Sequence, residues 1–460
     1  MKRIMTFFLV AIALSAPAGA QEFEHPTQMK LPDSEFSRPD PTDFQLSLGN
    51  GLVAYVARAD QVPLVTMSAF IRTGKTSDDK TGTAEVLTEA LLLGPADAVD
   101  FRSALKYMTA EFSVDMHDEW TEVTLNVPTE DLDAALRLFA GIILKPSIGS
   151  EAMARARTKA DPGEADLGGE SGPALYEGSL SAAVDRFHEV LYRDHPYGDR
   201  PTAADIAELN ASDIADFHAE QFVPANMTLA IAGDIDPDAM QTRIEKLFGD
   251  QPFAEPPSIR RAPVIAGLKL RQHTFPADKL QSWLVFGHEL PEVSLADQAA
   301  LEVMNYILAG GHLYTRMTIE TRYRYGYTND ASGFLEPRWF GPGSYTFRSY
   351  SRHDVIKPIF QNMMTEIERI QEEEVTDEEL FIAKGALADG SFQIRYLDGY
   401  AITRNFAIER LRYGDHSRSA SYIDRIQAVS KEDVIEAANK FIQPERMQII
   451  LVGKPTDLLN

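Results

Sequence analysis

Apolar and polar residues alternate with two different periods along the chain, and the two periods predict a mixed α/β protein. Residues 65–71 are rich in β-branched and aromatic side chains, which is typical of a strand. Residues 82–94 repeat apolar positions every three to four residues, which is the period of a helix. Asn50 and Gly51, directly before the apolar run 52–57, favour a tight β-hairpin. Such a mixture of hairpins and helices predicts a mixed sheet with helices packed on it.

The helix predicted at residues 82–94 has an apolar side and a polar side. Its apolar residues fall on one side, which we expect to be buried in the core. Glu85, Thr88 and Glu89 are spaced at i, i+3 and i+4, so they share the other side. Two carboxylates four residues apart on a helix repel each other, and the positive end of the helix dipole offsets part of that repulsion. The sequence therefore predicts an apolar helix with an acidic face.

One half of the chain repeats in the other. Residues 212–233 and 431–453 both read as a helix, a phenylalanine, a proline, a methionine and an apolar strand that ends in glycine. The proline, methionine and glycine pairs are each 220 residues apart, at Pro224 and Pro444, Met227 and Met447, and Gly233 and Gly453. An offset of half the chain indicates duplication of a whole domain. We predict an α+β fold of two homologous α/β domains, each a mixed sheet with helices packed on it.

The N-terminus has the features of a secretory signal. Lys2 and Arg3 precede the apolar run 5–14, and a small-x-small cleavage pattern ends at Ala20. We predict a signal peptide at 1–20, a first domain at 21–250, a proline-containing linker at 251–266 and a second domain at 267–460. The sequence contains no cysteine, which excludes disulfides and attachment of lipid through cysteine. An exported, cysteine-free chain indicates a bacterial periplasm.

The chain is strongly acidic, with a formal net charge of −25. Repulsion makes nucleic acid and anionic membrane surfaces unsuitable partners. After the signal segment, no apolar stretch approaches the length of a transmembrane helix, so we expect no membrane insertion. Neutral or basic polypeptides remain possible partners, and the charge also serves solubility.

Several motifs, in their order along the chain, resemble the pitrilysin/insulinase family of zinc metallopeptidases, which includes the mitochondrial processing peptidase subunits. The resemblance covers nearly all of the chain after the signal segment. It rests on the Asn50-Gly51 hairpin, Gly82-Thr-Ala at the helix start, the His195-Pro-Tyr-Gly turn, and the segments 222–234 and 322–332. It implies two duplicated α/β halves that enclose a chamber, in agreement with the internal repeat.

The resemblance also assigns the acidic helix face a role. Active members carry His-x-x-Glu-His there, with two histidines that bind Zn²⁺ and a glutamate that activates water. In this sequence the ligand positions hold Glu85 and Glu89, and the general-base position holds Thr88. A threonine hydroxyl does not accept a proton near neutral pH as a carboxylate does. The third ligand position corresponds to Glu164 or Asp166, and the sequence does not choose between them.

An oxygen-ligated metal is the alternative at this helix. Glu85 and Glu89, together with Glu164 or Asp166, would offer Mg²⁺, Ca²⁺ or Mn²⁺ an all-oxygen site. Paired glutamates are also common on exposed helix faces that bind nothing, and that simpler interpretation is favoured. His117, His195 and His218 are expected to be structural or exposed to solvent.

The resemblance implies a second site, in the C-terminal half, where family members hold the substrate with an arginine and a tyrosine. Arg322 retains the arginine, and Asn329 stands at the tyrosine position. A strand predicted at 326–333 would place Tyr327 on the same strand face as Asn329, so that Tyr327 replaces the missing tyrosine. The competing interpretation of Arg322 is a salt-bridged surface arginine.

These features predict a non-catalytic peptidase subunit without a cofactor of its own. It would pair with a zinc-bearing homologous subunit and help to enclose and bind a polypeptide substrate. A stand-alone peptide-binding or holding homodimer is the alternative, and an active peptidase with an oxygen-ligated metal is a further one.

Overall fold

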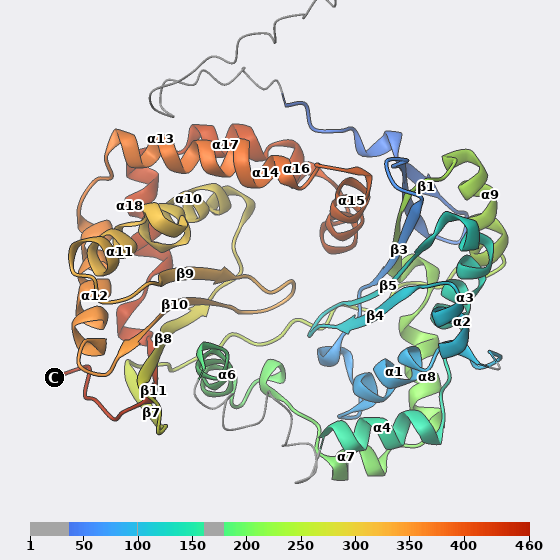
Figure 1. Cartoon of the computed structure of the whole chain (residues 1–460), viewed down its shortest axis with the longest axis horizontal. Helices are drawn as coiled ribbons and strands as arrows, with labels where there is room; N and C mark the ends of the chain where they lie inside the picture. Colours follow the sequence, from blue (N-terminus) through green and yellow to red (C-terminus); the bar gives the residue numbers. More distant parts are fainter. Residues whose placement is uncertain (1–35, 99, 161–178) are drawn as a thin grey trace, which may run out of the picture. The chain divides into compact units, whose positions relative to one another are not determined.

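The computed structural model describes residues 36–98, 100–160 and 179–460, and residues 38–460 form one compact unit. The predicted signal peptide lies outside the described residues, as do Glu164 and Asp166. The unit contains two mixed sheets with helices packed on them (Figure 1), so the predicted fold class is confirmed. The predicted boundaries between domain, linker and domain stay a prediction.

The first sheet has six strands in the order β1-β2-β6-β3-β5-β4. Its centre is the most apolar part, since all seven residues of β6 are buried. β6 pairs in parallel with β2 and antiparallel with β3, so the sheet is mixed. The strands are β1 (Gln45–Ser47), β2 (Val53–Arg58), β3 (Leu64–Ile71), β4 (Glu111–Met116), β5 (Thr121–Pro128) and β6 (Met227–Gly233).

The second sheet repeats this pattern in the order β7-β11-β8-β10-β9. β11 pairs in parallel with β7 and antiparallel with β8, as β6 does with its two neighbours. The strand order therefore matches the first sheet without β1, and the structure confirms the duplication predicted from the 220-residue offset. The strands are β7 (Arg271–Pro276), β8 (Gln281–Leu290), β9 (Ala331–Glu336), β10 (Gly343–Arg352) and β11 (Gln448–Gly453).

Helices cover both sheets, and amphipathic spacing explains most of them. The first half contains α1 (Thr83–Leu92), α2 (Phe101–Tyr107), α3 (Leu132–Leu144), α4 (Ser150–Ala160), α6 (Leu180–Leu191), α7 (Ala203–Glu208), α8 (Ala211–Gln221) and α9 (Pro237–Phe248). The second half contains α10 (Leu295–Asn305), α11 (Arg316–Thr318), α12 (Ile356–Glu372), α13 (Asp377–Gly385), α14 (Phe392–Ile394), α15 (Gly399–Tyr413), α16 (Ser417–Ala420), α17 (Tyr422–Ala428) and α18 (Lys431–Phe441). Within the described ranges no helix is both long and apolar enough to cross a membrane.

The two halves exchange one helix. α6 belongs to the first half of the sequence, but it packs on β8 and β11 of the second sheet. α15 belongs to the second half and packs on β6 and β2 of the first sheet (Figure 1). The 220-residue offset maps α6 onto residues inside α15, so the exchange is reciprocal between equivalent helices. Phe187 of α6 and Phe406 of α15 are fully buried at these contacts, and each half thus contributes to the core of the other.

The hairpin expected at Asn50 and Gly51 is present. β1 and β2 are antiparallel, with Ser47 opposite Val53. Gly51 adopts a φ of +91°, which favours glycine, and Ala225 lies where a Cβ would stand. The Asn50 amide donates to the carbonyl oxygens of Phe248 and Gln251, so the turn is held from outside the hairpin as well.

Candidate functional site

The start of α1 is fixed by an aspartate in the preceding segment. Gly82 occupies the N-cap with a φ of +96°, a conformation that a side chain would strain. The Asp78 carboxylate accepts hydrogen bonds from the backbone N–H groups of Gly82, at 3.0 Å, and Ala84, at 2.8 Å. These are N–H groups that a helix leaves free at its N-terminus. Asp78 therefore sets where α1 begins and in which orientation its side chains follow.

The polar face of α1 is mostly buried, which corrects the prediction of an exposed acidic face. Thr88 is 8% exposed and Glu89 is 9% exposed, while Glu85 is partly exposed. The reason is that α1 is covered on several sides, by α4, β4 and α8. The sequence shows the period of the helix, but it does not show that a second layer covers its polar side.

Thr88 and Glu89 are already engaged within the fold. The Thr88 hydroxyl donates to the Ala84 carbonyl oxygen at 2.8 Å and lies 3.2 Å from the Met116 sulfur. The Glu89 carboxylate pairs with the Lys159 ammonium at 3.5 Å, across the contact between α1 and α4. Thr88 is thus a helix hydroxyl bonded to its own backbone, and Glu89 is a carboxylate with a cation beside it.

Glu85 differs, because one of its oxygens has no partner. Its Oε2 atom is buried and finds no hydrogen-bond donor among the described residues. Burial, and then the nearby Glu85 carboxylate, raise the pKa of Asp78 to about 8. The two carboxyl groups thus sit close enough to disfavour their joint ionisation.

A cavity of about 310 Å³ opens beside these two carboxyl groups, and we call it the α1 cavity. Asp78 and Glu85 line it together with Lys75, Arg260 and Arg261. Arg260 donates to the Asp78 carbonyl oxygen at 3.1 Å and also pairs with Asp79, so the segment after α9 crosses in front of α1. The α1 cavity therefore combines partly buried carboxyl groups with cations.

The residues of α1 do not fit the zinc site of a His-x-x-Glu-His peptidase. Neither ligand position offers an imidazole, and the hydroxyl at the general-base position is bonded to the helix backbone. In the part of the chain that the structure describes, no three His, Asp or Glu side chains are grouped as metal ligands would be. Glu164 and Asp166, the alternatives for a third ligand, lie outside that part.

Arg322 lies at a turn of the second half and contacts Asn329. It belongs to a π-helical segment, Ile319–Arg324. Its Nη1 atom donates to the Asn329 carbonyl oxygen at 3.1 Å, and its guanidinium lies 5.7 Å from the centroid of the Tyr323 ring. Among the described residues no carboxylate pairs with Arg322, which gives the salt-bridged interpretation no support there. The sequence-predicted site residues thus form two groups, one on α1 and one here, with no hydrogen bond or ion pair between the groups within the described ranges.

The strand predicted at 326–333 is wrong at its start. Gly326 adopts a φ of +64° and its N–H donates to the Arg322 carbonyl oxygen, which ends the helical segment with a turn. β9 begins only at Ala331. Tyr327 is therefore in a loop, where its ring stacks on Tyr325 at 5.2 Å, and the period of a strand does not place it beside Asn329.

Of the three histidines considered from the sequence, two contact backbone carbonyl groups. One ring nitrogen of His195 lies 2.9 Å from the Pro263 carbonyl oxygen, and one of His218 lies 2.8 Å from that of Ile143. Burial lowers the pKa of His218, which favours the neutral ring. His117 stacks on Trp120 at 4.0 Å. These contacts support the structural interpretation of the three histidines.

Sequence reasoning missed a junction between two hairpins. Glu119, in the turn between β4 and β5, is buried and accepts the Tyr197 hydroxyl at 2.5 Å. It also accepts the backbone N–H groups of Trp339 and Phe340, in the turn between β9 and β10. Beside it the rings of Trp120 and Trp339 stack at 5.4 Å. An acidic residue in a hairpin turn normally faces solvent, so the sequence carried no signal of this role.

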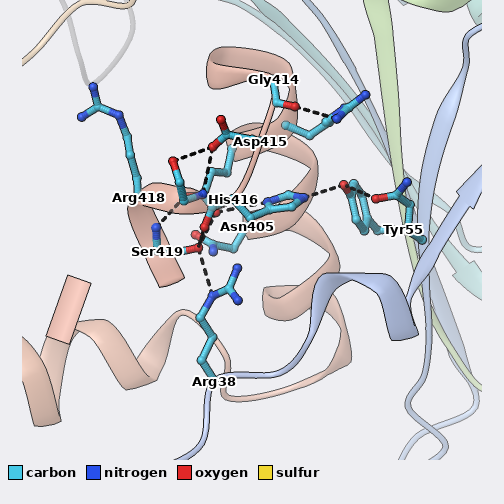
Figure 2. Close-up of polar contacts among 12 residues, drawn as sticks. Arg38, Tyr55, Asn405, Gly414, Asp415, His416, Arg418 and Ser419 are labelled. Atoms are coloured by element: carbon cyan, nitrogen blue, oxygen red, sulfur yellow. Dashed lines mark hydrogen bonds and ion pairs between the residues drawn. The ribbon is translucent and has the colours of Figure 1, made fainter. Parts of the chain in front are cut away.

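A second polar network, shown in Figure 2, joins β2 to the end of α15. The Tyr55 hydroxyl lies 2.7 Å from one ring nitrogen of His416, whose other ring nitrogen lies 3.3 Å from Glu409. Ser419 donates to Glu409 at 2.5 Å and accepts from Arg38 at 3.0 Å. Burial raises the pKa of Tyr55 to about 12. The Tyr55 side chain is buried, so this network fastens the exchanged helix and is not an accessible reaction centre.

Comparison with known proteins agrees with this architecture. Residues 208–387 match the family model described as peptidase M16 inactive domain. A protein of Rickettsia felis named uncharacterized zinc protease is 22% identical over 427 residues, which cover 90% of this chain and 98% of that protein. The mitochondrial-processing peptidase subunit beta of Saccharomyces cerevisiae is 21% identical over 72% of this chain and 73% of its own length.

A solved structure shows the same fold. It is described as the peptidase M16 inactive domain from Pseudomonas fluorescens, and it superposes with a TM-score of 0.75 at 19% identity, covering 90% of this chain and 98% of that one. The duplicated sheets agree with that fold, and the α1 positions that the resemblance assigns to the zinc motif hold Glu85, Thr88 and Glu89. These findings support a peptidase M16 inactive domain at residues 208–387 and a similarity of the whole chain to M16 proteins, while its sequence contains no His-x-x-Glu-His motif.

Proposed function

We propose that the chain is a non-catalytic subunit of a zinc peptidase. It would pair with a zinc-bearing homologous subunit, and the two would enclose and bind a polypeptide substrate. The observation that carries the proposal is the state of α1, where both ligand positions hold glutamate and the Thr88 hydroxyl donates to the Ala84 carbonyl oxygen. The match of residues 208–387 to the peptidase M16 inactive domain and a similar protein named as a subunit support it.

The contacts around α1 support a stable replacement of the catalytic apparatus. Glu89 is held by Lys159, and Asp78 fixes the helix start through two backbone N–H groups. The fold that presents the motif is thus kept, while the residues that would perform the chemistry are absent. In this proposal zinc belongs to the partner only, the chamber between the duplicated halves is used for binding, and Arg322 with Asn329 contacts the substrate backbone.

The first experiment measures zinc and peptide cleavage for the purified chain alone. We expect less than one zinc per chain and no cleavage of an unstructured polypeptide. A zinc-bearing homologue from the same cell, added to the chain, should cleave faster than the homologue alone. Stoichiometric zinc together with cleavage by the isolated chain would disprove the proposal and favour the oxygen-ligated alternative. In that case Glu89→Gln should abolish the activity.

A second experiment separates the pairing from a stand-alone role. The tagged chain is purified from its own cells, and its partners are examined for a homologue that carries His-x-x-Glu-His. A homodimer that binds peptide without such a homologue would instead support the holding function. We also infer a periplasmic location from residues 1–20. Fractionation of cells that express the full chain, and the same chain without these residues, tests this inference.

A further inference from the structure

A second cavity, of about 270 Å³, lies in the C-terminal half, and we call it the arginine cavity. It is lined by Arg338 and Trp339 in the turn between β9 and β10, by Arg412 and Tyr413 at the end of α15, and by Arg418 of α16. Leucines from α10 and from the ends of β8 and β9 complete an apolar side. None of these residues belongs to α1 or to the segment that contains Arg322. The cavity is therefore separate from both sites considered above.

Arg412 lines the cavity with an unsatisfied guanidinium. Its Nη2 atom donates to the Arg338 carbonyl oxygen at 2.9 Å. Its Nε atom is buried and has no acceptor among the described residues. Within the same ranges no carboxylate forms an ion pair with it, and burial lowers its pKa. A buried donor without a partner costs free energy, which a bound acceptor would recover.

Arg418 provides a second cation on the same wall. Its only described polar side-chain contact is a hydrogen bond donated to the side-chain amide oxygen (Oε1) of Gln298, at a long 3.3 Å. The Tyr413 ring lies 4.9 Å from the Arg412 guanidinium and 4.2 Å from that of Arg418, so it holds the two cations beside one ring. In Figure 2 the Arg418 side chain extends away from the contacts of His416 and Ser419.

The acidic residues of the cavity have partners of their own. Glu292 pairs with Arg261 at 2.8 Å, and Glu302 accepts the Tyr422 hydroxyl at 2.5 Å. Arg338 is neutralised by Asp118 at 2.8 Å. Among the described residues, Arg412 and Arg418 therefore have no carboxylate to balance their positive charge. This is notable in a chain whose net charge is −25.

We propose that the arginine cavity binds a carboxylate attached to an apolar or aromatic group, with Arg412 and Arg418 holding the carboxylate. Guanidinium groups match the planar fork of a carboxylate, and the charge-assisted hydrogen bonds that result are strong. The leucines and Trp339 contact the apolar part of the ligand. A phosphate carries more negative charge, and Glu292 and Glu302 repel it. The carboxylate comes either from the C-terminus of a polypeptide or from a small organic acid.

The binding test uses the full chain and three probes. These are acetyl-Ala-Ala-Phe with a free carboxyl terminus, the same peptide as its C-terminal amide, and 3-phenylpropionate. Calorimetry gives the affinity, and the fluorescence of Trp339, which lines the cavity, reports occupancy. We expect the free acid to bind at least about tenfold more tightly than the amide, because only the acid makes charge-assisted hydrogen bonds. Binding of 3-phenylpropionate as tight as that of the peptide acid identifies a small acid as the ligand, and weaker binding identifies a peptide C-terminus.

The variants place the binding in this cavity. Arg412→Gln and Arg418→Gln should each weaken binding of the acid by about tenfold or more. Arg410→Gln is the matched control, because Arg410 lies on the same helix, is exposed and donates to the Gly414 carbonyl oxygen. It should leave binding unchanged. Should Arg412→Gln fail to fold, Arg418→Gln alone decides. Equal affinity for acid and amide, no saturable binding, or an equal loss with Arg410→Gln would overturn the proposal.

Discussion

The α1 cavity and the arginine cavity occupy comparable places in the two duplicated halves. The α1 cavity lies where the segment after β3 enters α1, next to the turn that follows α6. The arginine cavity lies where the segment after β8 enters α10, next to the end of α15, the helix equivalent to α6. The first contains two partly buried carboxyl groups, Asp78 and Glu85, and the second contains the guanidinium groups of Arg412 and Arg418, which have no carboxylate partner among the described residues.

The comparison shows that the two halves share the same backbone arrangement but differ in the polar side chains at their cavities. Strand order, parallel pairing and the exchanged helix are the same in both halves. Both cavities contain acidic and basic side chains, but among the described residues a buried polar atom without a partner is a carboxylate oxygen of Glu85 in the α1 cavity and a guanidinium nitrogen of Arg412 in the arginine cavity. On α10 the Gln298 amide donates to Glu302 at 2.8 Å, whereas on α1 an oxygen of Glu85 has no donor among the described residues. Buried polar atoms without a partner are uncommon in folded proteins, and both cavities contain at least one, on Glu85 in the first and on Arg338 and Arg412 in the second.

The largest effect is expected at the exchanged helices, and it tests whether α6 and α15 stabilise the two halves equally. Phe187→Ala on α6 and Phe406→Ala on α15 each remove a fully buried ring from the sheet of the other half. Each should lower the free energy of unfolding by about 3–5 kcal/mol. Phe381→Ala, at a side chain that is 79% exposed, is the control and should change it by less than about 0.5 kcal/mol. Urea denaturation measures all three, and a loss confined to one helix would show that the exchange stabilises only one half.

The next effect concerns the junction between the hairpin turns. Glu119→Gln weakens the acceptor of the Tyr197 hydroxyl and of the N–H groups of Trp339 and Phe340. With buried donors left poorly paired, the free energy of unfolding should fall by about 1–3 kcal/mol. The stacked rings of Trp120 and Trp339 should also separate, which changes tryptophan fluorescence. Glu130→Gln, at an exposed position, is the control. Unchanged stability and fluorescence in Glu119→Gln would show that this contact does not join the hairpins.

The duplicated fold of this protein could be predicted from sequence, but most contacts of the candidate functional site could not. The repeated phenylalanine, proline, methionine and glycine positions indicated the duplication, because a buried strand and its preceding turn constrain residue type. The altered motif at Glu85, Thr88 and Glu89 was also found, but its burial was not, since burial depends on α4 and α8 from elsewhere in the chain.

Three further features could not be predicted from sequence patterns. The segment at Tyr327, expected to be a strand, follows a turn at Gly326 instead. The positive φ of Gly326 cannot be predicted from the periodicity of apolar residues. The exchange of α6 and α15 leaves their amphipathic pattern unchanged, so the pattern does not show which sheet each helix covers. The arginine cavity brings together residues from elements that are distant in the sequence, and the local pattern of apolar and polar residues does not predict such contacts.

The pH dependence of stability separates the two cavities further. The folded-state pKa of Asp78, about 8, is above the value of about 4 for an unfolded aspartate. Between these values the folded chain binds more protons than the unfolded chain, so this group makes stability fall as pH rises from about 4 to about 8. Asp78→Asn should remove that fall, which amounts to about 1–3 kcal/mol after allowance for partial exposure. Urea midpoints of both proteins across this range measure the difference.

Asp79→Asn is the matched control for this titration. Asp79 is the adjacent residue, exposed and paired with Arg260, so its removal should leave the pH slope of the wild-type chain unchanged. A wild-type slope that persists in Asp78→Asn would contradict the repulsion between Asp78 and Glu85. A slope that disappears in both variants would assign it to the surface charge of this segment.

The smallest effect is expected at the ion pair between Glu89 and Lys159. Lys159 is largely exposed, and its ammonium lies at 3.5 Å from the carboxylate, so solvent screens most of the attraction. Lys159→Gln should lower the free energy of unfolding by about 0.5–1 kcal/mol, and the loss should shrink at high salt. Arg155→Gln, which removes the exposed pair with Glu151 on the same helix, is the comparison. A loss several times larger in Lys159→Gln than in Arg155→Gln would mean that Glu89 is a buried charge dependent on Lys159, and that the α1 site, like the arginine cavity, holds a charge that needs a counter-ion.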